Sequence, residues 1–536
     1  MRFLKWGIVG ISCLIVGCQI QNQKPTTEVE KANKEGILLV GIGPDPEGFD
    51  PQLVTGVTEQ NVLRSLFEGL VVPDPKMLKP KPGAAERWEI QENRYIFHLR
   101  PNACWNNGEP LTAHDFVFTF QRLLTPQLAA PNASTFFVIK NAKAFYDGEI
   151  AFQEVGVKAL DDDTLEIVLE QPVPFFLSLL IQPCCYPAHQ KSLEQNACAW
   201  TRNPNGYPTH HLVSNGAFQL KQWAIGEKIE VVKNTHYWNH QNVRLNGIHF
   251  FPIADVAAEE RAFRRGQLHI TENVPYQKLY FYHTKKNSPL QIHPYLNTFY
   301  YLLNINVYPL NDVRIRQALS LAIDRNQLAG SDHFKLKHRS AYQLVPEGCA
   351  GFLSTRPVQE NVLMARTLLS EAGFPNGKGF PKLTLLFNAS EGQTYIASAI
   401  QEMWRKYLRI TVELVNQEWK VYLQRRRDGQ FEIARGGWVG DYNDPTTFLN
   451  LWKKDANNNF VRWHNETFES LLLKANDPLY RTQRLRLLQE AEKVLLEDVP
   501  LIPIHSSTTS HLVHPTVHNW VGNLLDWHPY DCIFLQ

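Results

Sequence analysis

The 536-residue sequence has no excess of charge, because 54 basic residues are matched by 53 acidic ones and the net charge is +1. A chain without a strong positive field does not hold a polyanion by counterion release, so nucleic acid is not expected as a partner. Charged residues make up 20% of the chain and apolar residues 44%, a balance that excludes a disordered protein. The sequence therefore predicts a globular protein, and its length predicts two or three domains.

Motifs of the common enzyme classes are also missing. The sequence has no GxSxG, Walker or HExxH pattern. Gly41-Ile42-Gly43 begins like a dinucleotide fingerprint, but Pro44 follows directly, and Asp45 and Glu47 would repel phosphate. The histidines show no partner carboxylate at ligand spacing, and the cysteines lack the paired CxxC spacing of structural zinc. No enzyme, cofactor or metal is expected, although a hydrolase with an unrecognised site stays as a weaker alternative, since catalytic residues can come from distant positions.

Long apolar runs are absent after the N-terminus, where no stretch reaches eighteen uninterrupted apolar residues, so no later membrane span is expected. At the N-terminus, Arg2 and Lys5 precede the apolar run Trp6–Val16, which is too short to cross a ~30 Å hydrocarbon layer as a helix. This pattern predicts a signal peptide over residues 1–18 and an extracytoplasmic location, in the periplasm or at the cell surface.

The signal peptide ends in Ile15-Val16-Gly17-Cys18, which resembles the lipobox of bacterial lipoproteins. The resemblance implies that Cys18 is acylated and anchors the protein to a membrane. An ordinary signal peptide that contains a cysteine is the alternative. Residues 19–35 are polar and charged, which predicts a flexible tether between the anchor and the folded protein.

Six cysteines follow Cys18, and an extracytoplasmic location permits disulfides. A bridge from Cys184 or Cys185 to Cys198 would close a short loop and is the first pairing to test. Buried thiols or one bridge are the simplest expectation for the set, which is Cys104, Cys184, Cys185, Cys198, Cys349 and Cys532.

Strand-like and helix-like patterns interleave along the chain. Residues 37–42, 164–169 and 228–232 are short apolar or alternating runs, which predict strands. Residues 396–407 and 485–496 carry apolar side chains at helical spacing, which predicts amphipathic helices. This order is typical of α/β lobes, and no internal repeat divides the chain.

Ordered motifs over nearly the whole mature chain resemble one family. The longest are WNNGEPLTAHDF at 105–116, SNGAF at 214–218 and ARGGWVGDYNDP at 434–445. They resemble the peptide-binding (family 5) extracellular solute-binding proteins of ABC importers, and in particular the oligopeptide-binding branch. Further motifs in the order of the family are Phe49-Asp50-Pro51, Leu66–Leu70, Gly156–Ala159, Asn234–Trp238, Val313–Leu319, Glu371–Phe374 and Asn416–Lys420.

This resemblance implies an α/β, periplasmic-binding-protein-like fold of type II, cluster C, with two lobes, a hinge and an interlobe ligand cleft. Residues 36–69, 191–292 and 509–536 would form lobe I, residues 70–190 an additional subdomain II, and residues 293–508 lobe III. It also implies a monomer that captures short peptides, closes over them and passes them to the membrane permease of an ABC importer.

A receptor for peptides of many sequences must bind what all peptides share, namely main-chain amides and carbonyls and the two charged termini. Pairing an extended ligand with strand-like segments satisfies the main chain without reading side chains. By analogy with the family, these segments are Gly56-Val57 on one lobe and Arg435 to Val439 on the other. Gly436 and Gly437 would permit close approach of a ligand backbone, or alternatively mark a tight contact within the sheet.

Charged residues for the two peptide termini also follow from the resemblance. Asp441 matches the aspartate that binds the ligand ammonium, with a turn-capping aspartate as the alternative, a role that suits Asp444 better. Arg426 and Arg435 are placed in the pocket for the ligand carboxylate, which a planar guanidinium can hold with two hydrogen bonds. The alternative for Arg426 is a solvated basic helix end.

Aromatic residues complete the expected site. Trp419 and Trp438 match positions that pack against ligand side chains or backbone, and Tyr300 is placed in the same site. Both tryptophans are equally compatible with an ordinary core role.

Several positions depart from the family pattern and leave the preferred peptide length open. Asn132 stands where the best-known members have a tyrosine near the ligand, Thr55 replaces an acidic residue, and Gln393 replaces a histidine. A cysteine pair of the family is replaced by Asn297 and Val439. The basic segment 331–339 also departs from the pattern and is either a further carboxylate anchor or a charged surface loop. A receptor specialised for cell-wall (murein) peptides is the main alternative function.

Overall fold

The computed structural model describes residues 26–195, 200, 212–328, 332–355, 358–388 and 391–536. The predicted signal peptide, lipidated Cys18 and Cys198 lie outside these residues. The other five cysteines after Cys18 are free thiols in the structure. No helix in the described part of the chain is long and apolar enough to span a membrane.

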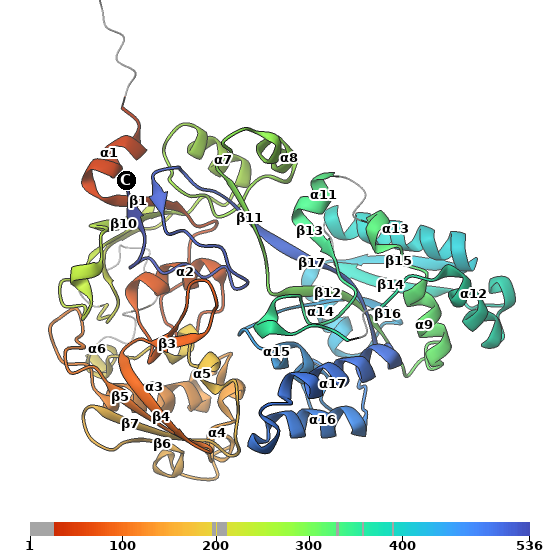
Figure 1. Cartoon of the computed structure of the whole chain (residues 1–536), viewed down its shortest axis with the longest axis horizontal. Helices are drawn as coiled ribbons and strands as arrows, with labels where there is room; N and C mark the ends of the chain where they lie inside the picture. Colours follow the sequence, from red (N-terminus) through yellow and green to blue (C-terminus); the bar gives the residue numbers. More distant parts are fainter. Residues whose placement is uncertain (1–25, 196–199, 201–211, 329–331, 356–357, 389–390) are drawn as a thin grey trace, which may run out of the picture.

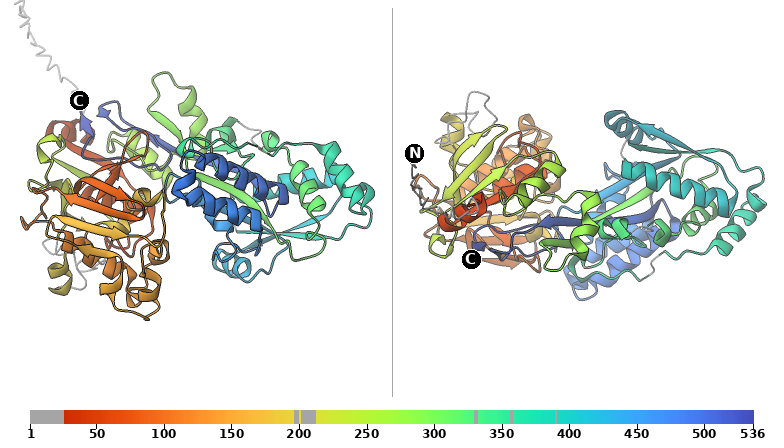
Figure 2. Two further views of the ribbon diagram at one scale, coloured as in Figure 1. Left: turned by 60° about the horizontal axis from the view of Figure 1, so that its bottom comes forward. Right: turned by 90° about the horizontal axis from the view of Figure 1, so that it is seen from above.

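Two bodies lie side by side and are joined by long strands (Figures 1 and 2). The first body contains two four-stranded sheets that share one core. Its first sheet has the order β1-β10-β9-β8. Strand β1 (Ile37–Gly41) is parallel to β10 (Gly247–Phe251), and β9 (Lys228–Lys233) is antiparallel to both β10 and β8 (Phe218–Ala224). Its second sheet is antiparallel, with the order β4-β5-β7-β6. The members of this second sheet are β4 (Ala85–Gln91), β5 (Arg94–Leu99), β7 (Thr164–Val168) and β6 (Val157–Ala159).

The second body is built on a seven-stranded sheet with apolar cores on both faces. Its order is β11-β17-β12-β16-β14-β15, and β13 also pairs with β17. The strands are β11 (Leu290–Pro294), β12 (Asn297–Leu303), β13 (His338–Ser340), β14 (Leu383–Asn388), β15 (Val412–Gln417), β16 (Ile433–Val439) and β17 (Leu501–Leu512).

Helices cover the sheets of both bodies. In the first body they are α1 (Glu28–Glu35), α2 (Val57–Leu66), α3 (Ala113–Leu124), α4 (Ala142–Tyr146), α5 (Phe176–Leu179), α6 (Gln190–Gln195), α7 (Val256–Arg264) and α8 (Tyr276–Thr284). In the second they are α9 (Val313–Leu321), α10 (Arg325–Leu328), α11 (Asp332–Lys337), α12 (Val362–Glu371), α13 (Glu391–Leu408), α14 (Trp419–Arg427), α15 (Thr446–Leu449), α16 (Glu466–Asn476) and α17 (Arg484–Asp498). Short strand pairs are formed by β2 (Val71–Pro73) with β3 (Pro80–Pro82) and by β18 (Val517–His518) with β19 (Phe534–Leu535).

The hinge consists of the antiparallel strands β11 and β17, which run between the two bodies (Figure 1). The far end of β17 is fastened to the first body, where the amide of Thr271 donates to the carbonyl oxygen of Leu512 (3.1 Å). A β-bridge between Ile270 and Val513 continues this contact. The C-terminal segment after β17 therefore belongs to the first body, although most of the preceding 200 residues belong to the second.

The strands predicted at 37–42, 164–169 and 228–232 are confirmed as β1, β7 and β9, and the two predicted helices as α13 and α17. The flexible tether predicted for residues 19–35 is wrong for its last part, because residues 28–35 form α1. Thr27 and Glu30 cap this helix reciprocally, and Val29 and Ala32 are buried against Leu39. Two apolar side chains at helical spacing are therefore enough to dock the short helix α1 on the first sheet.

The motif Ser214-Asn215-Gly216 connects the first sheet to the end of α2. The side chain of Asn215 accepts from the amide of Glu68 (3.0 Å) and donates to its carbonyl oxygen (2.8 Å). Gly216 donates its own amide to the carbonyl oxygen of Leu66 (2.8 Å). A Cβ atom at residue 216 would lie 2.5 Å from the main-chain carbon of Leu66, so only glycine fits this contact.

Gly216→Ala is expected to lower the free energy of unfolding by ~2 kcal/mol, because the added methyl group meets backbone that cannot move aside. Urea unfolding followed by tryptophan fluorescence measures the change. Gly392→Ala is the matched control, since a Cβ there meets nothing within 4 Å. Equal midpoints for the two variants would contradict the packing argument.

Candidate ligand-binding cleft

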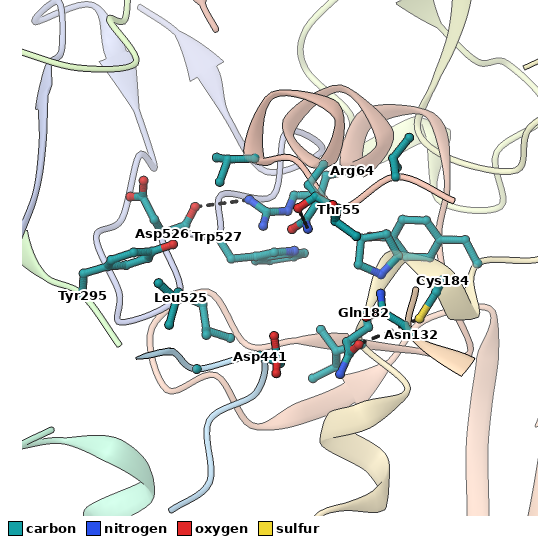
Figure 3. Close-up of a pocket in the computed structure, with 18 residues that line it drawn as sticks. Thr55, Arg64, Asn132, Gln182, Cys184, Tyr295, Asp441, Leu525, Asp526 and Trp527 are labelled. Carbon is teal, nitrogen blue, oxygen red and sulfur yellow. Dashed lines mark hydrogen bonds between the residues drawn. The ribbon is translucent and has the colours of Figure 1, made fainter. Parts of the chain in front are cut away.

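A cavity of about 370 Å³ lies between the two bodies. Its walls come from the start of α2, the chain around 181–186, the end of β16 and the C-terminal segment 525–527 (Figure 3). The stacked rings of Phe175 and Tyr442, with centroids 5.1 Å apart, connect the two bodies beside it. The lining residues are Val54, Thr55, Val57, Gln60, Arg64, Asn132, Ile181, Gln182, Pro183, Cys184, Tyr186, Tyr295, Val439, Gly440, Asp441, Leu525, Asp526 and Trp527.

Asp441 points into this cavity from the loop after β16 (Figure 3). Its amide donates to Oγ1 of Thr447 (3.1 Å), which fixes the backbone. Within the described residues its carboxylate has neither a hydrogen bond nor an ion pair, and loss of solvent around it raises its pKa to about 6. A partly desolvated carboxylate without a counter-ion is poised to accept a cationic group.

Asp444, three residues further along, is fully used by the protein itself. Its Oδ1 accepts from the amide of Thr446 (3.0 Å), which is the turn role predicted for it. It also forms a two-pronged ion pair with Arg484, with N–O distances of 2.8 and 2.9 Å. The two neighbouring aspartates therefore differ in function: one supports the loop, and the other faces the cavity.

The edge of β16 is open along the part that leads to the cavity. Strand β14 pairs with β16 only at Ile433 and Ala434. The amide of Gly440 donates to Leu296 beside β12, whereas the carbonyl of Arg435 points the other way and accepts from the hydroxyl of Tyr422. Because alternate residues of a strand direct their main-chain groups to opposite edges, those of Gly437 and Val439 point to the open edge.

Arg435 and Arg426 place two positive charges close to β16. The guanidinium of Arg435 lies 4.8 Å from the ring centre of Phe299, and that of Arg426 lies 4.5 Å from the ring centre of Phe460. The Nε atoms of both are buried without a hydrogen-bond partner, and neither forms an ion pair in the described part of the chain. Burial lowers the pKa of Arg435. Arg426 also donates to the hydroxyl of Tyr422 (3.2 Å), so it is not a solvated helix end.

The two glycines of β16 serve the sheet itself. The ring of Tyr300 lies against Gly436, and a Cβ on Gly437 would lie 2.7 Å from the ring of Phe299. The tight sheet contact is therefore present, and the approach of a ligand backbone at these glycines stays a prediction. Tyr300 itself is buried, 7% exposed, in the core beneath β16.

The two tryptophans occupy different environments. Trp419 begins α14, is 47% exposed and stacks on Tyr422. Trp438 packs on the core beneath the sheet, with its indole nitrogen buried and unpartnered. Neither lines the cavity between the bodies.

The segment Gly56-Val57 is not the strand-like element expected. Gly56 has extended dihedral angles (φ −72°, ψ 148°), but Val57 is the first residue of α2. This segment is helical because the six buried residues of α2 recur at helical spacing, which places them on one face against the first sheet. Val57 still lines the cavity and is 50% exposed, so only the short stretch before it offers extended backbone.

Among the positions that depart from the family pattern, Asn132 and Thr55 line the cavity, and Asn297 pairs directly with Val439 in the sheet. Gln393 lies in α13, and the segment after residue 331 forms α11 and β13. Cavity residues that the sequence did not single out include Arg64, Gln182, Tyr295 and Trp527. No local pattern marks them, because they come from four separate elements.

Two α/β bodies, a strand hinge and an interlobe cavity, which Asp441 enters without a partner among the described residues, define the class of two-lobed ligand-binding proteins; Arg426 and Arg435 do not line this cavity. Residues 79–460 match the family model described as "Bacterial extracellular solute-binding proteins, family 5 Middle". The chain belongs to this family, as predicted, and the predicted two-lobed periplasmic-binding-protein fold is confirmed.

Named relatives span nearly the whole chain. The periplasmic oligopeptide-binding protein OppA of Salmonella typhimurium is 36% identical, covering 95% of this chain and 93% of the relative. The periplasmic murein peptide-binding protein MppA of Escherichia coli is 37% identical, covering 91% and 90%. The solved structure of MppA in an "Unliganded Open Form" superimposes with a TM-score of 0.82 at 34% identity, covering 94% of this chain and 98% of that one. The relatives are periplasmic binding proteins, which supports an extracytoplasmic location.

Asp444→Asn and Asp441→Asn are expected to change stability in opposite directions. Asp444 and Arg484 are 9% and 12% exposed, and removing one charge of a buried pair costs about 3 kcal/mol. Asp441 has a folded pKa of about 6, above its ordinary value of 3.8, so its ionisation lowers stability progressively as the pH rises from about 4 to 6, and the full cost is present above 6. Asp441→Asn should therefore unfold at an equal or higher urea concentration than the wild type at pH 7.5. A large loss of stability in Asp441→Asn would show that its carboxylate supports the fold.

Proposed function

We propose that the protein is a lipid-anchored extracytoplasmic receptor that captures short peptides between its lobes and delivers them to the permease of an ABC importer. The observation that carries the proposal is the arrangement of charge along β16. Among the described residues, a carboxylate without a partner stands after one end of β16, and two guanidiniums without counter-ions lie near its other end. An extended peptide has the complementary features, with an ammonium, a row of amides and carbonyls, and a carboxylate.

The spacing fits a short ligand. Arg435 and Asp441 are six residues apart, which is about 20 Å of extended chain. A long arginine side chain shortens the gap, so peptides of about three to five residues would bridge the two charges. The main-chain groups of Gly437 and Val439 lie between them and would pair with the ligand backbone. Binding at the termini and the main chain leaves side-chain sequence largely unread.

Lobe closure would complete the site. The cavity is open to solvent, and the fold matches an unliganded open form. Bending at β11 and β17 would bring α2 and the segment before it against the ligand and exclude water. Charge-assisted bonds strengthen when they are shielded from solvent, so closure and terminal recognition would support each other.

A second candidate is a receptor for cell-wall peptides, which the similarity to the murein peptide-binding protein MppA favours. Murein peptides also carry free carboxylates, so they suit the same guanidiniums. We further propose that the protein acts as a monomer and has no hydrolytic activity, since the family consists of solute-binding proteins. The lipid anchor at Cys18 is proposed from the sequence alone.

Isothermal titration with unrelated tri- to pentapeptides is expected to give one-site binding to the wild type. Asp441→Asn should weaken binding more than tenfold, because truncating one partner of a shielded charge pair costs ~2 to 5 kcal/mol. N-acetylated peptides should bind the wild type weakly and be insensitive to Asp441→Asn. Asp477→Asn, in an exposed turn, is the control. Absence of heat with every peptide would refute the proposal. Binding confined to murein tripeptide would support the second candidate. Cleavage of the added peptides, detected by mass spectrometry, would instead indicate a hydrolase.

Peptide affinity is expected to fall as the pH decreases below about 6. The free protein takes up a proton at Asp441 with a pKa of about 6, and the protonated carboxyl cannot pair with an ammonium. The dissociation constant should therefore rise by up to tenfold for each pH unit below 6 and change by only about twofold between 6 and 7.5. In Asp441→Asn this rise of the dissociation constant at low pH should disappear. If the same rise persisted in that variant, another titrating group would be responsible for it.

A further inference from the structure

Three side chains with metal-binding atoms meet at the end of the hinge, and the proposed function does not use them as a group. We call His511, Asp526 and His528 the hinge cluster. Nε2 of His511 lies 3.0 and 3.1 Å from the two carboxylate oxygens of Asp526, and Nε2 of His528 lies 3.1 Å from Oδ1. One potential ligand atom from each residue lies within 4.8 Å of the others.

The hydrogen-bond partners of His511 require a positive charge in the cluster. Its Nδ1 lies 2.9 Å from the carbonyl oxygen of Thr271, which can only accept, so Nδ1 carries a hydrogen. A neutral ring then presents the lone pair of Nε2 to a carboxylate that offers only lone pairs. Either a proton or a metal ion must therefore lie between these atoms.

Both the surroundings and the donor set suit a metal ion. A histidine that donates its other nitrogen to a backbone carbonyl has the orientation typical of metal ligands, because the carbonyl fixes the ring. The histidine side chains are 3% and 5% exposed, whereas Asp526 is 16% exposed and lines the cavity. Arg64 donates to the main-chain oxygen of Asp526 (3.2 Å), so it does not occupy the carboxylate (Figure 3).

We propose that the hinge cluster is a site for a divalent transition-metal ion, with Zn²⁺ as the best match. Two imidazoles and one carboxylate are common protein ligands of Zn²⁺, and a site with three protein ligands keeps one position open. Here the open position faces the cavity on the side of Asp526. The ion would tie the end of β17 to the C-terminal segment that supplies Leu525, Asp526 and Trp527 to the cavity wall. This proposal is independent of whether the ligand is a peptide.

Titration of chelator-treated protein with ZnCl₂ at pH 7.5 is expected to show one bound equivalent, together with a higher unfolding temperature. Asp526→Asn and His528→Gln should each abolish this binding. The matched control is His189→Gln, because His189 is also buried beside a carboxylate, Glu109, at 2.6 Å, but belongs to no metal-ligand cluster in the described part of the chain. Binding that persists in both cluster variants would overturn the proposal.

Co²⁺ provides a readout that does not depend on the folding of the variants. The wild type should develop the visible absorption of four- or five-coordinate Co²⁺ with nitrogen and oxygen ligands. An intense sulfur-to-metal charge-transfer band would instead place the ion on a free thiol such as Cys532 and refute the assignment. Absence of binding of either ion would show that a proton balances the cluster, with His511 as an imidazolium, and would also refute it.

Discussion

The central constraint in this protein is that opposite charges carried close together in the sequence are held apart. Asp441 and the two guanidiniums lie along one stretch of chain, yet none of them has a counter-ion among the residues that the structure describes. A strand enforces this separation, since its extended backbone cannot fold back and let Arg435 reach Asp441. The cost appears as a raised pKa for Asp441 and a lowered pKa for Arg435.

The surrounding structure makes this arrangement tolerable. Asp444 and Arg484 form the ion pair that Asp441 does not, and so hold the loop in place. Phe299 and Phe460 lie against the guanidiniums and offer their ring faces, where a carboxylate partner would block the site. The strands β11 and β17 connect the two bodies. Of two aspartates in the same loop, Asp444 thus supports the fold, whereas Asp441 faces the cavity.

Local patterns predicted much of the fold, whereas features formed between distant segments were predicted poorly. Alternation and helical spacing located β1, β7, β9, α13 and α17, because the apolar residues of each buried face lie within one short continuous segment of sequence. The tether prediction missed α1, whose two apolar residues are significant only beside a sheet. The strand-like role of Val57 was also wrong, since the helix starts there. The hinge cluster was missed because Asp526 follows His511 by fifteen residues, which resembles no ligand spacing.

By itself, the sequence determined the class of fold, the family and the chemical types available to the site, because motifs such as GWVGDYNDP occupy consecutive positions. Only the tertiary structure decided which of Asp441 and Asp444 stays unpaired, which edge of β16 is open, and that Arg64 and Trp527 share a cavity with Asp441. The physical reason is that pairing, desolvation and edge exposure depend on what packs alongside. Those neighbours come from segments tens to hundreds of residues away, and no local pattern encodes them.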